Sequence, residues 1–325
     1  MTAGVVGTGM YVPEKVLTNA DLEKMVDTND EWITSRVGIK ERRIAAPGET
    51  TSSMGAAAAR AALADAGITA AEVDLIITAT ITPDMPWPST ACFIQRALGA
   101  TRAACFDVEA ACTGFVYALS LARNYVATGM YRTVLVVAAE TLSRITDWED
   151  RNTAVLFGDA AGAAVIKAVA PPAGILATHL GADGSKGELL EMPGGGSRHP
   201  TSHETVEARM HFIRMKGNEV FKHAARAMAH SNSEVLAKAG ITIDQVDLLI
   251  PHQANMRIIE AAARLSKLPM EKVYLNLMHY GNTSAATTAV ALAEARRDKR
   301  VGPGSLCLLV AFGGGFTWGA CLLRL

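Results

Sequence analysis

Residues 63–77 read LADAGITAAEVDLII, and residues 236–250 read LAKAGITIDQVDLLI. The two stretches match at a constant offset of 173 residues, from 63 to 236 and from 77 to 250. Each predicts the end of a helix, a glycine that caps it, and a buried strand. Because the unit occurs twice, it indicates a duplicated α/β fold rather than a solenoid.

The length of the chain points the same way. Its 325 residues exceed the usual size of a single hydrophobic core. We therefore expect two halves, residues 1–170 and residues 171–325, divided near Pro171 and Pro172. Halves of this kind pack face to face, so functional loops from both are expected to converge on one site.

The composition argues against several classes of function. With a net charge of −1, the chain has no overall attraction to nucleic acid or to a membrane surface. No apolar run reaches the ~20 residues of a membrane span, and residues 1–9 do not resemble a signal peptide. Five cysteines in no framework spacing indicate reduced thiols and a cytoplasmic protein. A metal site is not expected, because C-x-x-C pairs are absent and His199, His203 and His211 lack ligand spacing.

Cys112 lies between a predicted strand, residues 104–108, and a predicted helix in which nearly every position is apolar. A helix of that composition is expected in the centre of the fold. Unpaired N–H groups and the positive dipole end at the start of the helix favour a thiolate, so we predict a lowered pKa for Cys112. Cys112 is therefore a candidate nucleophile, whereas the other four cysteines are expected to be small buried hydrophobic residues.

Three clusters in the second half share the position of Cys112 at the end of a candidate core strand. His252 follows the repeated strand, Asn282 lies at an expected strand-to-helix junction, and Gly313–Gly315 follow the strand expected at 305–312. Each has an ordinary explanation: a core histidine, an N-cap and a tight hairpin. Their common position favours a single site. A Cys, His and Asn set also suits a cysteine hydrolase, but the duplicated pattern does not suggest a papain-type enzyme.

Residues 27–43 suggest a second function, the binding of a nucleotide. Thr28 or Asn29 is predicted to cap a helix that carries Trp32 and Arg36 one turn apart. An aromatic ring beside a guanidinium suits a nucleotide with phosphates. The alternative is a partly exposed tryptophan that packs on an arginine stem.

These motifs resemble those of thiolase-fold condensing enzymes, specifically the bacterial β-ketoacyl-acyl-carrier-protein synthase III family. Asn282 favours this initiating branch, because elongating relatives use Cys, His and His, and thiolases have a second catalytic cysteine. The resemblance implies an α/β, thiolase-like fold in which the duplicated unit packs as five layers (αβαβα). The matching motifs run in the family's order over essentially the full length: DTNDEWITSRVGIKERR (27–43), DVEAACTGFVYALS (107–120), FGDAAGAAV (157–165), RMKGNEVFK (214–222), PHQANMRII (251–259), YGNTSAA (280–286) and AFGGGFTWG (311–319).

The resemblance implies a decarboxylative Claisen condensation that initiates fatty-acid biosynthesis. Cys112 would take the acyl group from acyl-CoA, and the backbone N–H groups of Cys112 and Gly314 would hold the oxyanion. His252 and Asn282 would donate hydrogen bonds to the enolate formed from malonyl-acyl carrier protein. His252 is then expected to be neutral, with its proton on the nitrogen that faces the substrate. No metal, flavin or nicotinamide cofactor is implied, and acyl-CoA is a substrate.

The other site residues are implied by motif position. Trp32 and Arg151 would sandwich the CoA adenine, with Thr28 and Arg36 on its base and phosphates. The further residues are assigned to the pantetheine tunnel (Gly217 and Asn255), to packing beside the two donors (Phe312), and to a basic patch for acyl carrier protein (Arg257 and Lys222).

Trp87 and residues 194–204 depart from the family's pattern. In relatives, which are homodimers, the position of Trp87 comes from the partner subunit and closes the acyl pocket. A bulky tryptophan there predicts a short primer such as acetyl. Residues 194–204, expected to form a mobile surface loop, are longer than in some relatives.

Two alternative functions are compatible with a thiolase-like fold. One is a thiolase-fold acyltransferase or specialised-metabolite synthase that passes the acyl group to another acceptor. The other is a catalytically silent scaffold, which the intact Cys112, His252 and Asn282 argue against.

Overall fold

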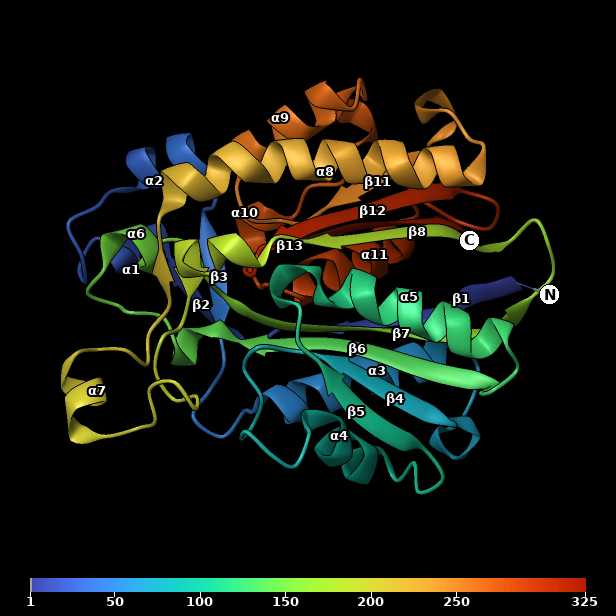
Figure 1. The fold of residues 1–325 in the computed structure, drawn as a ribbon, viewed down its shortest axis with the longest axis horizontal. Helices are drawn as coiled ribbons and strands as arrows, with labels where there is room; N and C mark the ends of the chain where they lie inside the picture. Colours follow the sequence, from blue (N-terminus) through green and yellow to red (C-terminus); the bar gives the residue numbers. More distant parts are fainter. Residues whose placement is uncertain (1) are drawn as a thin grey trace.

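The computed structural model describes residues 2–325, which form five layers in the order helix, sheet, helix, sheet, helix (Figure 1). The first sheet has the strand order β1-β7-β6-β4-β5 and the second has the order β11-β12-β13-β8. The strands of the first sheet are β1 (Thr2–Tyr11), β4 (Leu75–Ala79), β5 (Ala104–Val108), β6 (Thr133–Thr141) and β7 (Asp159–Val169). Those of the second are β8 (Gly174–Ala182), β11 (Leu248–Pro251), β12 (Leu306–Gly313) and β13 (Thr317–Arg324).

Helices fill the remaining three layers (Figure 1). The outer layers contain α3 (Thr51–Asp65) and α4 (Thr90–Leu98) on the first sheet, and α8 (Gly217–Ala239) and α9 (Met256–Leu265) on the second. The middle layer contains α5 (Gly114–Ala127) and α11 (Ala286–Arg297). The prediction of a central helix after Cys112 is confirmed, because α5 contacts strands of both sheets.

The repeated sequence forms the same structure twice, as predicted. Gly67 follows α3 and Gly240 follows α8, and both have a φ of +64°, a conformation that glycine adopts without a Cβ clash. In each copy a short 3₁₀ turn then leads into a strand, β4 or β11, whose residues are all buried. Both strands pair in parallel with a neighbour, β4 with β5 and β6 and β11 with β12.

Shorter elements gather at one end of the sheets, which Figure 1 shows on the left. Their bounds are β2 (Lys15–Thr18), α1 (Asn19–Leu22), α2 (Asp30–Val37), β3 (Glu41–Ile44), α6 (Arg151–Ala154), β9 (Leu190–Glu191), α7 (His203–Glu207), β10 (Arg214–Met215) and α10 (Leu277–Tyr280). Residues 195–204 lie on the surface, as expected, whereas Gly194 is buried. Hydrogen bonds from Gly194 N to Met210 O and from Gly195 N to His199 O shape this loop.

Residues 2–325 contain neither a membrane-spanning helix nor a cluster of metal ligands. No helix in this range is long and apolar enough to cross a membrane. Within the same residues, no group of three or more His, Cys, Asp or Glu side chains is arranged to hold a metal ion.

Gly162 allows β7 to approach the middle layer closely. A Cβ at this position would lie 2.5 Å from Ala289 Cβ and 2.8 Å from Val290 N, both in α11. Backbone atoms of a buried helix cannot move aside locally, so any side chain here separates the sheet from α11.

We predict that Gly162→Ala lowers the free energy of unfolding by about 2–3 kcal/mol, because overpacked cores are strained. Denaturant-induced unfolding measures this change. Gly48→Ala is the matched control, since a Cβ at Gly48 meets nothing within 4 Å. Equal unfolding midpoints for the two variants would contradict this account of the middle layer.

Candidate active site

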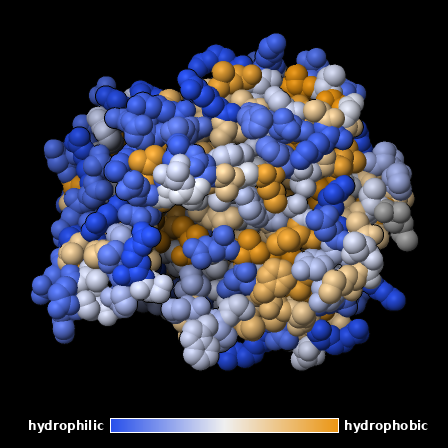
Figure 2. Space-filling model, in the orientation of Figure 1, coloured by the Kyte–Doolittle hydropathy of each residue, from blue (hydrophilic) through white to orange (hydrophobic). Residues whose placement is uncertain are grey.

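A cavity of about 1110 Å³ opens at the end of the sheets where the short elements gather. Figure 2 shows the same face of the molecule, where hydrophobic residues lie along the edge of a hollow. The cavity brings together residues that follow strands of the first sheet, such as Ala110 and Cys112, residues of β12 and β13 in the second sheet, and residues of α2, α8 and α9. Its walls include these residues predicted from the sequence: Trp32, Arg36, Cys112, Gly217, His252, Asn255, Arg257, Asn282, Phe312 and Gly314.

Cys112 lies in a 3₁₀ turn, Ala111–Thr113, between β5 and α5. The preceding Ala111 has a φ of +44°, an uncommon conformation for a residue with a Cβ. Gly313 explains how β12 approaches this turn, because a Cβ there would lie 2.6 Å from the Cys112 backbone nitrogen. Thr317 fixes the turn by donating a hydrogen bond to Ala110 O at 2.9 Å. Cys112, from the first half of the chain, is therefore held in place by the second half.

The predicted lowering of the Cys112 pKa is wrong. Burial raises the pKa of the Cys112 thiol to about 12, and the nearby Glu140 carboxylate also raises it. The side chain is almost fully buried in a largely apolar cavity, where the loss of water disfavours the thiolate. The nearby Ser284 side chain lowers the pKa of Cys112 by less than burial raises it.

Glu140 is a second buried group near the nucleophile, at the end of β6. It accepts hydrogen bonds from Thr82 Oγ1 at 2.6 Å, Thr80 Oγ1 at 3.2 Å and Ile81 N at 3.1 Å. Burial nevertheless raises its pKa to about 7. These bonds anchor the start of the loop that carries Trp87.

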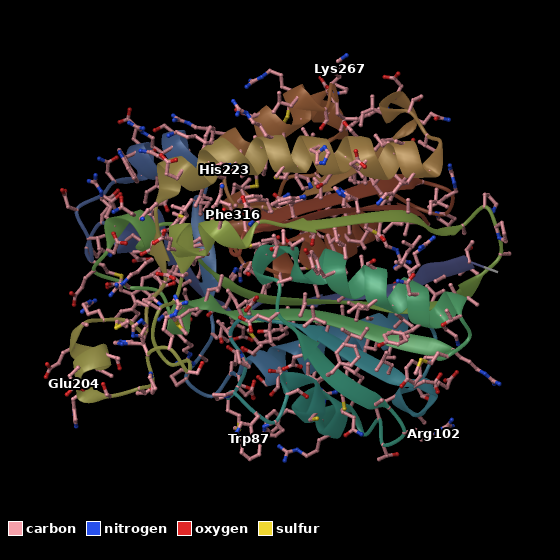
Figure 3. The ribbon with its side chains drawn as sticks, viewed as in Figure 1. Trp87, Arg102, Glu204, His223, Lys267 and Phe316 are labelled. Atoms are coloured by element: carbon pink, nitrogen blue, oxygen red, sulfur yellow. The ribbon has the colours of Figure 1, made fainter. Side chains whose placement is uncertain are left out.

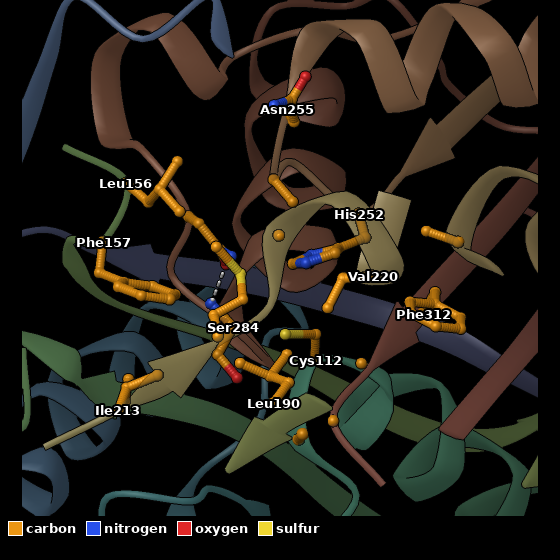
Figure 4. Close-up of a pocket in the computed structure, with 18 of the residues that line it drawn as sticks. Cys112, Leu156, Phe157, Leu190, Ile213, Val220, His252, Asn255, Ser284 and Phe312 are labelled. Atoms are coloured by element: carbon orange, nitrogen blue, oxygen red, sulfur yellow. Dashed lines mark hydrogen bonds between the residues drawn. The ribbon is translucent and has the colours of Figure 1, made fainter. Parts of the chain in front are cut away.

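His252 directly follows β11, and its ring faces the same space as the Cys112 sulfur (Figure 4). The His252 backbone donates a hydrogen bond to Val310 O at 2.8 Å, which continues the pairing of β11 with β12. Burial lowers the pKa of His252 to about 3. The ring is therefore neutral at physiological pH, as expected from the sequence.

Asn282 does not lie at the predicted strand-to-helix junction. It lies between two helices, α10 and α11, and pairs as a single bridge with Phe157 of the first half. Gly281, with a φ of +65°, permits this contact, because a Cβ there would lie 2.7 Å from Leu156 O. The sequence did not reveal the bridge, which joins residues 125 positions apart in the chain (157 to 282).

The side chain of Asn282 is oriented by its own backbone segment. Its Oδ1 accepts a hydrogen bond from Ser284 N at 2.9 Å. With the oxygen occupied in this way, the amide presents its NH₂ group as the available donor. Asn282 and the neutral His252 thus supply polar hydrogens without a net charge.

Trp32, Arg36 and Arg257 line the mouth of the cavity. Asn29 caps α2 by accepting from Trp32 N at 2.8 Å, as one of the two predicted caps. Arg257, in α9, donates to Ser35 O at 3.1 Å and so joins α9 to α2. An aromatic ring and two guanidinium groups therefore face one opening.

Arg151 and Thr28 lie near this mouth but are not part of the cavity wall. The Arg151 guanidinium stacks on Trp32, 4.9 Å from the ring centroid, and donates to Asp27 O at 2.9 Å. An aromatic ring between two planes needs about 7 Å, twice the van der Waals separation. The predicted adenine sandwich therefore requires Arg151 to move. Thr28 Oγ1 is buried and has no hydrogen-bond partner within residues 2–325.

Two further predicted site residues, Trp87 and Lys222, also lie outside the cavity. Trp87 projects from the loop between β4 and α4 into solvent (Figure 3), and 82% of its surface is exposed in the single chain. Lys222 forms an ion pair with Glu219 at 2.6 Å on the surface of α8.

The apolar part of the cavity wall was not predicted from the sequence. Ser284, although quoted in a motif, was not singled out either. An apolar residue in a sequence is assigned to the core by default, so no signal distinguishes these positions. The apolar wall includes Ile81, Leu142, Phe157, Leu190 and Ile213.

Comparison with known proteins gives consistent results at the level of families. The family model described as 3-oxoacyl-[acyl-carrier-protein] synthase III matches residues 106–184, and the model of its C-terminal part matches residues 236–325. A curated β-ketoacyl-[acyl-carrier-protein] synthase III from Caldanaerobacter subterraneus is 56% identical over 100% of this chain and 98% of its own length. One from Desulfitobacterium hafniense is 54% identical with the same coverage.

Solved structures give the same result. The 3-oxoacyl-[acyl-carrier-protein] synthase III of Aquifex aeolicus has a TM-score of 0.92 and 50% identity, with 99% of this chain and 100% of that chain covered. A priming β-ketosynthase of the R1128 polyketide pathway has a TM-score of 0.93 and 36% identity, covering 100% of this chain and 96% of its own.

We predict that alkylation of Cys112 in the folded protein still accelerates between pH 9 and pH 10, because its thiol pKa lies near 12. The rate of iodoacetamide labelling, read on the Cys112 peptide by mass spectrometry, measures this. In urea-unfolded protein the same peptide should approach its maximal rate just above the ordinary pKa of about 8.5. A plateau below pH 8 in the folded protein would restore the original prediction of an activated thiolate.

Proposed function

Because the chain belongs to the β-ketoacyl-[acyl-carrier-protein] synthase III family, we propose specific roles for its cavity residues in that family's reaction. The chain is a thiolase-fold condensing acyltransferase of fatty-acid biosynthesis. Within it, Cys112 carries the acyl group, and His252 and Asn282 stabilise the enolate of the extender. The observation that carries these assignments is the meeting of all three side chains, from two halves of the chain, in one cavity.

In the first step, the Cys112 sulfur attacks the thioester carbon of acyl-CoA. A new carbon–sulfur bond forms, the bond to the CoA sulfur breaks, and the thiol proton ends on CoA. Since burial disfavours a free thiolate, the proton leaves the sulfur as the bond forms rather than beforehand. Backbone N–H groups of Cys112 and Gly314 hold the oxyanion, a role supported by the close approach of the glycine segment to Cys112.

In the second step, malonyl-acyl carrier protein loses CO₂, and the electrons of the broken carbon–carbon bond form an enolate. His252 and Asn282 donate hydrogen bonds to the enolate oxygen. The enolate carbon attacks the acyl-cysteine carbonyl carbon, the bond from that carbon to the Cys112 sulfur breaks, and the sulfur takes up one proton from solvent to return to the thiol. The occupied oxygen of Asn282 and the neutral ring of His252 support this assignment. Both steps use side chains and backbone N–H groups of the protein, so no cofactor is assigned. Acyl-CoA is a substrate that donates the acyl group.

CoA occupies the mouth of the cavity in this proposal. Its adenine displaces Arg151 from Trp32 and stacks between them, near Thr28, and its phosphates meet Arg36. Pantetheine passes Gly217 and Asn255 to reach Cys112, while Phe312 packs beside the two donors. The substrates and the five free cysteines are consistent with a cytoplasmic enzyme.

The enzyme is proposed to act as a homodimer, with Trp87 of each chain closing the acyl pocket of the other. An indole that is 82% exposed in the single chain is available for such a contact. The short-primer assignment rests on this role of Trp87.

The second candidate is a synthase of specialised metabolism that transfers the acyl group to another acceptor. A priming β-ketosynthase of a polyketide pathway, which is 36% identical to this chain, supports this second candidate. Several β-ketoacyl-[acyl-carrier-protein] synthase III relatives are more similar, at 50–56% identity.

We predict that the purified enzyme, given malonyl-acyl carrier protein and acyl-CoA primers from acetyl to decanoyl, forms β-ketoacyl products from short primers only. Mass spectrometry of the products measures this, and Cys112→Ala is the inactive control. Trp87→Ala should extend the range to longer primers by removing most of the indole. Transfer to Cys112 without condensation on any primer would refute the proposed roles of His252 and Asn282.

A separate prediction concerns the carrier-protein patch. Arg257→Glu should raise the KM for malonyl-acyl carrier protein about tenfold and change kcat little, because it repels an acidic partner. Arg264→Glu, on the exposed side of the same helix α9, makes the same charge change and should alter the KM less. Equal effects of the two substitutions would exclude a specific contact at Arg257.

A further inference from the structure

Thr287, in the first turn of α11, lies directly behind the His252 ring. Its Oγ1 is 2.7 Å from His252 Nδ1, which is the one hydrogen bond that the ring makes within residues 2–325. Both side chains are buried, with 2% of Thr287 and 5% of His252 exposed. The contact therefore fixes the ring in a place where water does not compete.

The single hydroxyl proton of Thr287 has two possible acceptors, His252 Nδ1 and Ser284 O. The Thr287 hydroxyl also lies 3.0 Å from Ser284 O. If the hydroxyl donates to Nδ1, the neutral ring carries its hydrogen on Nε2, the other ring nitrogen. If it donates to Ser284 O, Nδ1 carries the hydrogen and donates to Thr287, and Nε2 becomes an acceptor.

We infer that Thr287 donates to His252 Nδ1 and thereby keeps the ring in the tautomer that presents Nε2–H to the enolate. Thr287 is a positioning residue that acts through His252. The inference rests on the proposed function, because only the condensation step requires a donor at Nε2.

The partners of Ser284 O favour this direction of the proton. The 2.7 Å separation of Thr287 Oγ1 and His252 Nδ1 suits either tautomer, so it shows only that the two groups are bonded. Ser284 O also accepts a hydrogen bond from the Thr287 backbone nitrogen at 3.2 Å, so it keeps a partner when the hydroxyl turns away. Nδ1 has no second donor in the described residues.

The same short segment orients both donors of the site. Ser284 N holds Asn282 Oδ1 at 2.9 Å, and Thr287, one turn later, holds His252 Nδ1. Asn282, Ser284 and Thr287 are close in sequence, so one segment orients both the amide of Asn282 and the imidazole of His252. A change at Thr287 should disturb the donor pair without touching the oxyanion donors near Cys112.

Thr287→Val and Thr287→Ser test the inference. Valine keeps the shape and removes the hydroxyl, so the rate of condensation should fall about tenfold to a hundredfold, less than the loss of a whole oxyanion donor. Serine keeps the hydroxyl and should restore most of the rate. The rate of acyl transfer from acyl-CoA to Cys112, followed separately, should change much less than condensation in both variants.

Thr288→Val is the matched control. Thr288 is the next residue of α11, is equally buried, and its hydroxyl has no hydrogen-bond partner within residues 2–325. Its substitution makes the same chemical change without removing a hydrogen bond. A similar fall in condensation for Thr287→Val and Thr288→Val would reduce Thr287 to a packing residue and overturn the inference.

The tautomer can also be observed directly. In ¹⁵N-histidine-labelled enzyme at pH 7, the His252 signals, identified by their absence in His252→Gln, should show a protonated Nε2 and an unprotonated Nδ1. A protonated Nδ1 in the wild type would overturn the inference. Failure of the proposed function looks different: the wild type itself would then acylate Cys112 without condensing.

Discussion

The exclusion of water from Cys112 and His252 is the constraint on which the rest of the site depends. Both side chains are nearly fully buried, and burial shifts their pKa values in opposite directions, to about 12 and about 3. Each shift favours the uncharged form. The cavity therefore holds a thiol, an imidazole and an amide, and no ion pair of the kind found in a papain-type hydrolase. Such a set suits a reaction in which charge develops only on the substrate.

Close backbone contacts between the two halves of the chain create this dry space. Gly313 brings β12 against the turn of Cys112, and Gly281 brings Asn282 against Leu156 and Phe157. At both places a Cβ would overlap backbone atoms, so the glycines are required by space. The side chains of Cys112, His252 and Asn282 are small, but their positions depend on a large framework of buried strands.

The sequence predicted the framework better than the chemistry. The repeat at 63–77 and 236–250 revealed the duplicated α/β unit, because a helix end, a glycine and an apolar strand are local signals. The α2 cap at Asn29 was predictable for the same reason. The Cys112 pKa was not, because it depends on how many residues from elsewhere exclude water. The bridge of Asn282 to Phe157 was also hidden, since it joins segments far apart in the chain.

If Cys112, His252 and Asn282 work as uncharged groups, the His252 ring must be neutral at physiological pH. A pH titration of the folded enzyme from pH 8 to pH 5, followed by the ¹⁵N signals of the His252 ring, measures the charge of the ring. With a pKa near 3, the signals should stay those of a neutral ring throughout this range. A titration with a midpoint near the ordinary value of about 6.5 would show a ring that water reaches, and would contradict the account.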